Sequence, residues 1–276
     1  MIPLTVDVRG PRRLPGRGSR IGGWLLLAAT FLAGPAALAA DLQVNPIMLE
    51  FAPGEQSQAL WLTNSGTQPL KAQVRVGRWT QADGKDQNES SRDLVASPAI
   101  LDIAAGEQQL VRIIRPRIEP LQSEAAYRLT IDELPVDGSE LERSGVQFLL
   151  RYSVPVFVLA EGTEPLGPTR RTANSPAHAP SPVGLSAMLQ DQGDKSLLRV
   201  SNPARQRVRM SNLAWVGSDG QRTELASGLF GYVLAGQEMQ WTIPLSPQQR
   251  AKGGTLKVRF NDDPNDQTLP LETAGR

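Results

Sequence analysis

Side chains that could carry out catalysis are few in this 276-residue sequence. Cysteine is absent, which excludes thiol nucleophiles, thiolate metal sites and disulfides. The only histidine, His178, lies in a proline-rich stretch with no serine or carboxylate at the spacing of a catalytic triad. A nucleophile elbow, a phosphate loop and a metal-ligand cluster are also missing from the sequence. Catalytic carboxylates that meet only after folding stay open, but the sequence predicts a protein that is not an enzyme and that has no cofactor and no metal.

The overall charge argues against two further classes of partner. Lys and Arg total 29 against 28 Asp and Glu, which gives a net charge of +1. Such a balance produces no field that would attract nucleic acid or an anionic membrane surface, so we expect neither as a partner. With 40% hydrophobic residues, the chain can bury one large core or two smaller ones.

The N-terminal segment has the composition of an export signal. Arginines between positions 9 and 20 precede an apolar run at residues 24–32, and Ala37-Leu38-Ala39 offers the small residues that signal peptidase requires. The run is too short to span a bilayer comfortably, so we expect no stable membrane insertion. We predict a signal peptide at residues 1–39, cleavage after Ala39 and a mature protein in the periplasm. The ordinary secretory route and a twin-arginine route through Arg12-Arg13 both stay open.

Beyond residue 40 the chain consists of short segments with period-two alternation, separated by clusters of Gly, Pro, Asn and Asp. We predict an all-β fold of two tandem immunoglobulin-like β-sandwich domains, at residues 40–160 and 183–262. A proline-rich linker at residues 161–182 separates them, and a flexible polar tail follows at residues 263–276. Strands are expected at residues 42–51, 59–63, 70–79, 101–103, 109–115, 127–134 and 146–159 of the first domain, with a polar loop at 83–92, and at residues 183–189, 197–201, 208–216, 229–234, 238–244 and 255–260 of the second.

The first domain carries a series of short runs in a particular order and spacing. They are Leu42-Gln43-Val44-Asn45-Pro46, residues 60–64, Ser97-Pro98, Gly106-Glu107, residues 109–112, residues 128–134, and Arg151-Tyr152-Ser153-Val154-Pro155-Val156-Phe157. Together they resemble the first domain of PapD-like periplasmic pilus chaperones, most of all the archaic, Csu-type branch. The resemblance implies two immunoglobulin-like domains in a boomerang arrangement. It also implies a protein that stabilises pilus subunits by donating a β-strand to them and delivers them to an outer-membrane usher.

Within the strand expected at residues 146–159, the resemblance assigns residues 146–153 to donation. Val146, Phe148, Leu150 and Tyr152 share one face at period two, so they could fill the pockets of a groove in a subunit that lacks a strand. Each could contribute about 1.5–3 kcal/mol if fully buried there. The alternative is a strand buried within its own sandwich. The polar residues 135–145 that precede it either leave the edge accessible or form an ordinary hairpin loop.

A basic pair that grips the terminal carboxylate of the bound subunit is a second feature of the family, and this sequence departs from it. Met48 and Pro155 stand at the two basic positions of the family, and neither can bind a carboxylate. Arg151 and Arg115 are the candidate anchors, because a guanidinium binds a carboxylate through two parallel hydrogen bonds. Each could equally be an ordinary solvated arginine on the surface of a sandwich.

Two further expectations concern architecture and the class of function. Arg112 and Glu133 match family positions that form a structural ion pair bracing the first domain. The alternative function, from a different class, is an exported β-sandwich adhesin or carbohydrate-binding module. Aromatic residues make up only 5% of the chain, which is low for a sugar-binding cleft.

Overall fold

The computed structural model describes residues 42–135, 149–166, 182–261 and 263–272. The predicted signal peptide, His178, Val146 and Phe148 lie outside these residues. Within the described ranges, no helix combines the length and the apolarity that crossing a bilayer would need. The described residues contain one short helix, α1 (Pro247–Ala251), and their other regular elements are strands. The predicted all-β fold is therefore confirmed.

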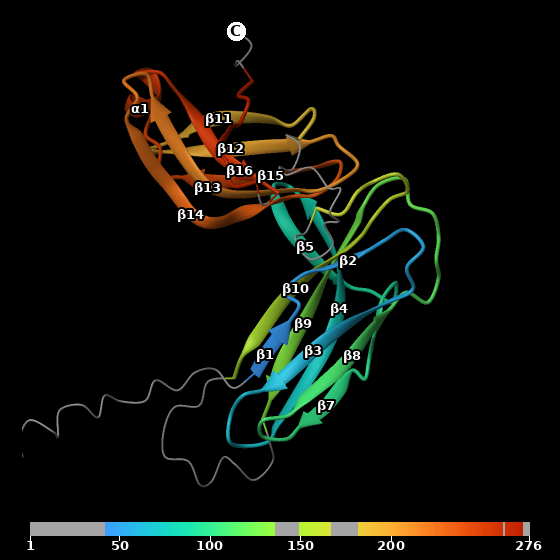
Figure 1. Cartoon of the computed structure of the whole chain (residues 1–276). Coiled ribbons are helices and arrows are strands. Elements are labelled where there is room, and N and C mark those ends of the chain that lie inside the picture. The colour runs from blue at the N-terminus through green and yellow to red at the C-terminus, as the bar shows by residue number, and fades with distance from the viewer. Residues whose placement is uncertain (1–41, 136–148, 167–181, 262, 273–276) are drawn as a thin grey trace, which may run out of the picture. The chain divides into compact units, whose positions relative to one another are not determined.

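The first sandwich consists of two sheets (Figure 1). One sheet has the order β1 (Leu42–Asn45), β3 (Ser57–Asn64), β8 (Gln108–Ile114) and β6 (Val95–Ser97). The other has the order β2 (Leu49–Phe51), β10 (Arg151–Val158), β9 (Ala125–Leu134), β4 (Leu70–Ala82) and β5 (Lys85–Ser90), with β7 (Ile100–Ile103) also paired to β4. The chain thus crosses between sheets from β1 to β2 and from β2 to β3.

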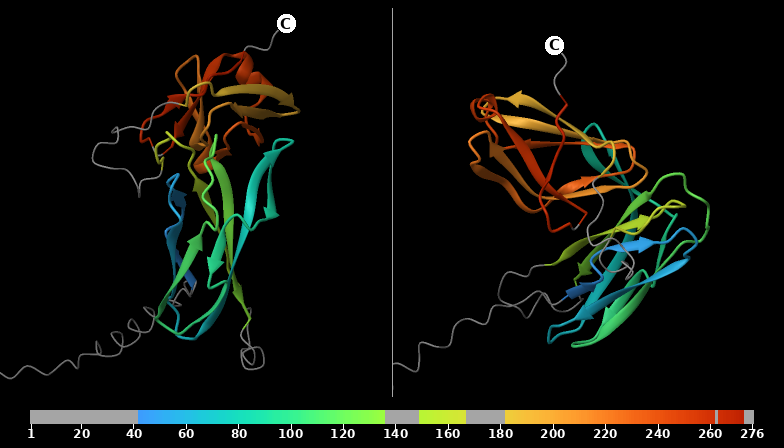
Figure 2. Two further views of the ribbon diagram at one scale, coloured as in Figure 1. Left: turned by 90° about the vertical axis from the view of Figure 1, so that its right-hand side faces the viewer. Right: turned by 45° about the horizontal axis from the view of Figure 1, so that its top comes forward.

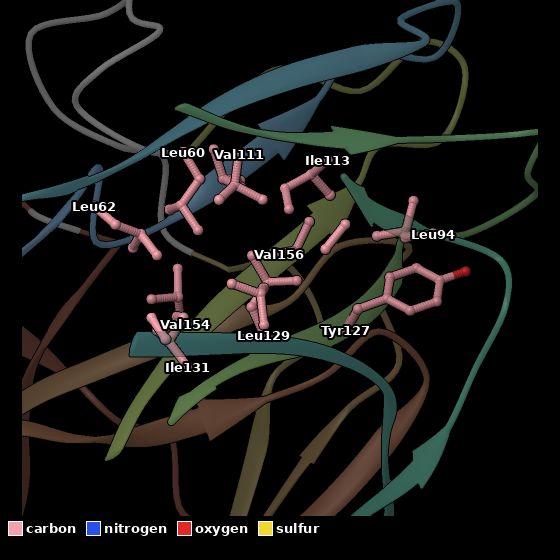
Figure 3. Close-up of a cluster of buried hydrophobic side chains, with 14 of the residues drawn as sticks. Leu60, Leu62, Leu94, Val111, Ile113, Tyr127, Leu129, Ile131, Val154 and Val156 are labelled. Carbon is pink, nitrogen blue, oxygen red and sulfur yellow. The ribbon is translucent and has the colours of Figure 1, made fainter. Parts of the chain in front are cut away.

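The core of this sandwich lies between the two sheets and follows from the period-two alternation of the sequence. Leu60 and Leu62 of β3 and Val111 and Ile113 of β8 point inward from one sheet, and all four are fully buried (Figure 3). They face apolar side chains of the other sheet, namely Leu129, Ile131, Val154 and Val156. Because successive side chains of a strand point to opposite faces, each buried residue is followed by one that faces away from the core.

The second sandwich also consists of two sheets, drawn in yellow to red in Figure 2. The first contains β11 (Ser186–Gln192), β12 (Lys195–Asn202) and β15 (Gln237–Ile243). The second has the order β14 (Arg222–Val233), β13 (Val208–Gly217), β16 (Gly254–Phe260) and β17 (Gln267–Thr268). Its core is a separate cluster that includes Leu198, Val200, Met210, Leu213 and Phe260. The prediction of two β-sandwiches is confirmed.

One strand of the first sandwich was predicted as a polar loop. Residues 85–90 form β5, which pairs with the end of β4 through a tight turn at Asp83 and Gly84, both with positive φ (53° and 70°). All six side chains of β5 are exposed, so the sequence shows no alternation of apolar residues there. Backbone hydrogen bonds to β4 stabilise this strand. Such bonds do not depend on side-chain type, so the sequence gives no sign of them.

The predicted flexible tail is wrong for residues 263–272. Leu269 is 1% exposed, and β17 pairs with β16. The backbone of Ala187 donates to the carbonyl of Pro270 at 3.0 Å and accepts from Glu272 N at 2.8 Å. The segment therefore packs against both sheets of the second sandwich, because one buried leucine and a few main-chain bonds outweigh its polar composition.

Candidate strand-binding edge

β10 has one edge that is only partly covered by another strand. It pairs with β9 along its whole length, whereas β2 covers only Val156–Val158 on the other side. Among the described residues, no strand pairs with residues 151–155 on that side. An unpaired edge of this kind can accept an added strand.

The direction of the backbone groups along this edge follows from two hydrogen bonds that β10 makes with its neighbours. Leu150 O accepts from Glu133 N of β9 at 2.9 Å, and Leu159 N donates to Phe51 O at 2.9 Å on the β2 side. Because the backbone groups of a strand alternate between its two neighbours, Arg151 and Ser153 direct their N–H and C=O groups to the open side. Pro155 is next in this series and has no N–H to donate. Pairing with an added strand would therefore lose a bond at Pro155.

The side chains of β10 divide into a core face and an outer face. Val154, Val156 and Val158 are buried, while Leu150 and Tyr152, on the same face, are half-buried against the same core. Tyr152 Oη also donates to the carbonyl oxygen of Leu42. Residues 154–158 therefore fit the alternative to donation, in which the strand is buried in its own sandwich. Burial of this face decreases from there toward Leu150. Val146 and Phe148, the other two predicted donor residues, lie outside the described residues.

A hollow lies beside the end of this edge. Its volume is about 570 Å³, and both Ser153 and Pro155 line it. The opposite wall comes from the second sandwich, where the rings of Phe230 and Trp241 pack with centroids 4.9 Å apart. The other lining residues are Ile47, Trp79, Asp86, Arg128, Arg209, Leu229, Gly231, Tyr232 and Met239. A chain that followed the open edge past Ser153 would enter a largely apolar, aromatic space.

Arg151 is the first residue of β10 and lies on its open edge, and Asp132 of β9 is its ion-pair partner. Burial acts to raise the pKa of Asp132, but hydrogen bonds from Arg151 and Arg75 outweigh it and lower the pKa. The side chain of Arg151 is 70% exposed, and only its Nε is bonded to Asp132. Its terminal nitrogens remain accessible for a second anion.

Arg115, the other candidate anchor, has a different environment. It is 4% exposed, and its Nη1 donates to the carbonyl oxygens of Pro53 at 2.7 Å and Glu55 at 3.3 Å. It lines a different hollow, beside Tyr127. The structure thus places Arg115 as a brace of loops and does not bring it to the edge of β10.

The structure does not bring Arg112 and Glu133 together. Arg112 follows the inward-pointing Val111 on β8, so it is exposed on the outer face of its sheet. Glu133 lies on β9 in the opposite sheet and accepts a hydrogen bond from Leu150 N at 3.3 Å. No ion pair joins the two side chains within the described ranges, so the predicted brace is absent there.

A buried ion cluster that the sequence did not reveal links the two sandwiches. Arg207, just before β13, bonds to Glu50 of β2 through Nη2 and to Glu124 Oε2 through Nη1, the latter at 2.6 Å. None of the three side chains is more than 2% exposed. The guanidinium also lies 3.6 Å from the ring centroid of Phe157 and 3.8 Å from the sulfur of Met48. The only hint in the sequence is Glu50 itself, a charge between two core residues of β2.

The charges within this cluster are unequal, since one guanidinium faces two carboxylates. Burial raises the pKa of Glu124, although Arg207 opposes that shift. Burial acts to lower the pKa of Arg207, but the two carboxylates outweigh it and the pKa is raised, so the arginine stays charged. The cluster lies next to the end of β10 that β2 covers, because Glu50 of β2 is paired with Phe157.

Comparisons with known proteins agree with this architecture. Residues 41–163 match the family described as pili and flagellar-assembly chaperone, PapD N-terminal domain. No match to a curated protein sequence was found. A crystal structure of the CsuC-CsuE chaperone–tip adhesion subunit pre-assembly complex, from archaic chaperone-usher Csu pili of Acinetobacter baumannii, is similar with 26% identity and a TM-score of 0.64, over 84% of this chain and 98% of that one.

Two more distant structures share the fold. The Escherichia coli chaperone DraB is 15% identical with a TM-score of 0.53, over 84% of this chain and 96% of that one. The complex of the Salmonella enterica SafA pilin with the SafB chaperone gives 12% identity and a TM-score of 0.53, over 84% of this chain and 95% of the matched chain.

Proposed function

We propose that this chain, a PapD-like protein of the archaic type whose residues 41–163 are the family's N-terminal domain, is a chaperone that holds pilus subunits by donor-strand complementation. The observation that supports this most is the open edge of β10. It presents the backbone groups of Arg151 and Ser153 beside an apolar face whose burial is incomplete at Leu150 and Tyr152. A subunit that lacks a strand needs both features, main-chain partners and apolar side chains.

The donor residues in this proposal are Val146, Phe148, Leu150 and Tyr152. The main-chain bonds to the edge are independent of sequence, so they suit a chaperone for several related subunits. The apolar side chains supply the rest of the affinity because they leave water when the subunit closes over them.

Hydrogen exchange tests the edge directly. In the free protein the amides of Arg151 and Ser153 should exchange quickly, and in a complex with a subunit they should be protected. The amides of Tyr152 and Val154, which face β9, serve as internal controls that are protected in both states. A stable complex in which Arg151 and Ser153 still exchange quickly would contradict strand addition at β10.

The carboxylate anchor in this proposal is Arg151, because its terminal nitrogens are exposed at the edge. Arg151→Ala should weaken subunit capture about tenfold, as expected for the loss of a charge-assisted hydrogen bond. Arg115→Ala should instead lower the stability of the chaperone, since Arg115 bonds to backbone carbonyls. Pull-down and urea unfolding of both variants separate these effects, and unaltered capture by Arg151→Ala would remove it as the anchor.

Delivery to an outer-membrane usher is part of the same proposal. Pairing along β10 should be incomplete near Pro155, so part of the subunit groove would stay open to the strand of an incoming subunit. Exchange would then need no nucleotide, because greater burial in the product drives it. Mixing a chaperone–subunit complex with a subunit's strand peptide, without ATP, should yield transferred subunit. A peptide that binds free subunit but never displaces the chaperone, with the usher present, would contradict this step.

The location and processing of the chain follow the same proposal. Residues 1–39 are removed as a signal peptide, and the two sandwiches work in the periplasm. N-terminal sequencing of the mature protein should begin at Ala40. A start at a residue inside the first sandwich would contradict this assignment.

The alternative of an adhesin or carbohydrate-binding module has one observation in its favour, the aromatic wall of Phe230 and Trp241. Aromatic rings of this kind can stack on sugars. A glycan array screened with the wild type and Trp241→Ala distinguishes the two functions. Glycan binding that Trp241→Ala abolishes, together with unchanged subunit yield in all edge variants, would favour the adhesin.

A further inference from the structure

A second hollow, in the first sandwich and separate from the strand-binding edge, gathers positive charge. Its volume is about 210 Å³. Its charged lining residues are Arg78, Arg92, Arg115 and Arg117, with Asp93 and Glu119 as the carboxylates. Four guanidinium groups against two carboxylates leave a formal surplus of two positive charges around one concave space.

Arg115 forms the buried floor of this hollow. Its exposed fraction is 4%, and its hydrogen-bond partners are backbone carbonyls. Among the described residues, no carboxylate forms an ion pair with it. Carbonyl dipoles satisfy its N–H groups but carry no net charge, so its positive field extends into the hollow.

Arg78 and Tyr127 form the side of the hollow next to β4 and β9. Arg78 Nη1 donates to Tyr127 Oη at 2.7 Å, and Tyr127 Oη donates to Asp93 Oδ2 at 3.2 Å. Asp93 also lies 3.7 Å from Arg78, so its charge is already shared with that arginine. Burial raises the pKa of Tyr127, which keeps the hydroxyl protonated.

Arg92 and Arg117 complete the rim. Both are exposed, and neither has an ion pair or hydrogen bond with any residue in the described part of the chain. Their guanidinium groups are therefore available for a ligand, and the parallel N–H groups of a guanidinium match two oxygens of an oxyanion.

We propose that this hollow binds a small tetrahedral oxyanion of the phosphate or sulfate class. A doubly charged anion would balance the surplus of two charges, whereas a single carboxylate would leave half of it. The volume accommodates such an ion with some water but not a folded polymer segment. The phosphate could be free in solution or be exposed in the headgroup of an anionic lipid.

Isothermal titration calorimetry of the full chain with inorganic phosphate, at ionic strength held constant with chloride, tests this site. Saturable binding is expected, with a rise in Tm of a few degrees at saturating phosphate. Arg92→Ser and Arg117→Ser should each weaken phosphate binding about tenfold. Arg112→Ser is the matched control, because Arg112 is an exposed arginine of the same sandwich that does not line this hollow.

Vesicle flotation separates the two sources of phosphate. Binding to phosphatidylglycerol vesicles that free phosphate competes away, and that Arg117→Ser loses, indicates a lipid headgroup. Phosphate binding without vesicle binding indicates the free ion. Equal stabilisation by chloride, or phosphate binding that is the same in Arg92→Ser, Arg117→Ser and Arg112→Ser, would overturn the site.

Discussion

Both sandwiches contribute a strand with an open edge to the lining of the aromatic hollow. These are β10 of the first, which β2 covers only in part, and β14 of the second, and the two edges are built differently. β10 keeps one continuous register with β9 over 8 residues. β14 pairs with β13 through three register shifts, near Gly228 (φ 65°) and Asn212 (φ 53°). Bulges twist an edge away and prevent pairing with another chain, whereas a regular edge accepts a strand. Under the proposed function, this difference favours β10 over β14 as the site of strand addition.

The largest expected effect comes from removing the buried arginine next to the covered end of β10. Arg207→Ala would remove the buried cation that bonds to both Glu50 and Glu124, so we expect a loss of about 3–5 kcal/mol in the free energy of unfolding, measured in urea. Arg222→Ala is the matched control on β14. Its ion pair with Asp266 is partly exposed, so the loss should stay below about 1 kcal/mol. Equal losses would mean that the buried cluster does not support the edge of β10.

Phe148→Asp should abolish subunit capture while the chaperone stays folded. A charge forced into an apolar groove costs several kcal/mol, so capture in a pull-down should fall by at least about a hundredfold. Leu149→Asp is the control at the neighbouring position, where the side chain is 46% exposed. Unchanged subunit yield with Phe148→Asp would refute the donor assignment, and equal loss with Leu149→Asp would show that the face is misassigned.

The bulge of β14 can be weakened at Asn212. Its Oδ1 accepts a hydrogen bond from Gly228 N at 2.8 Å, and its backbone has a positive φ. Asn212→Ala should therefore lower the free energy of unfolding by about 1–2 kcal/mol. Asn212→Gly removes only the hydrogen bond and should cost less. If both variants unfold like the wild type, the bulge is not held by this residue.

The smallest expected effect is the contribution of Glu124 to the pH dependence of the free energy of unfolding. Burial raises its pKa in the folded state, so the folded protein binds a proton that the unfolded chain releases. Its contribution to stability is therefore present below the unfolded pKa and is lost as the pH rises through the folded value. Glu124→Gln leaves Arg207 paired with Glu50 alone and should flatten the stability profile above pH 4.5, the ordinary pKa of a glutamate. Parallel profiles for variant and wild type would contradict this account.

Much of the architecture was predictable because it depends on local pattern. Alternating apolar residues identified β8, β9 and most strands of the second sandwich, though not β17, since a sheet with one buried face requires period two. β5 was missed because its polar side chains carry no such pattern. The position of Arg151 on β10 was predicted, whereas the role of Arg115 was not, because its carbonyl partners come from loops about 60 residues away in sequence.

The sequence by itself determined that this protein forms two β-sandwiches without disulfides, and that one strand carries an unusually apolar face. Only the tertiary structure decided which part of that face is buried in its own core. It also decided where the backbone edge of β10 is open, because β2 covers only residues 156–158. The cluster of Arg207, Glu50 and Glu124 was likewise decided only by tertiary structure. A buried ion pair is defined by the meeting of distant residues and by the exclusion of water from them, and neither is a property of the residues taken in order along the chain.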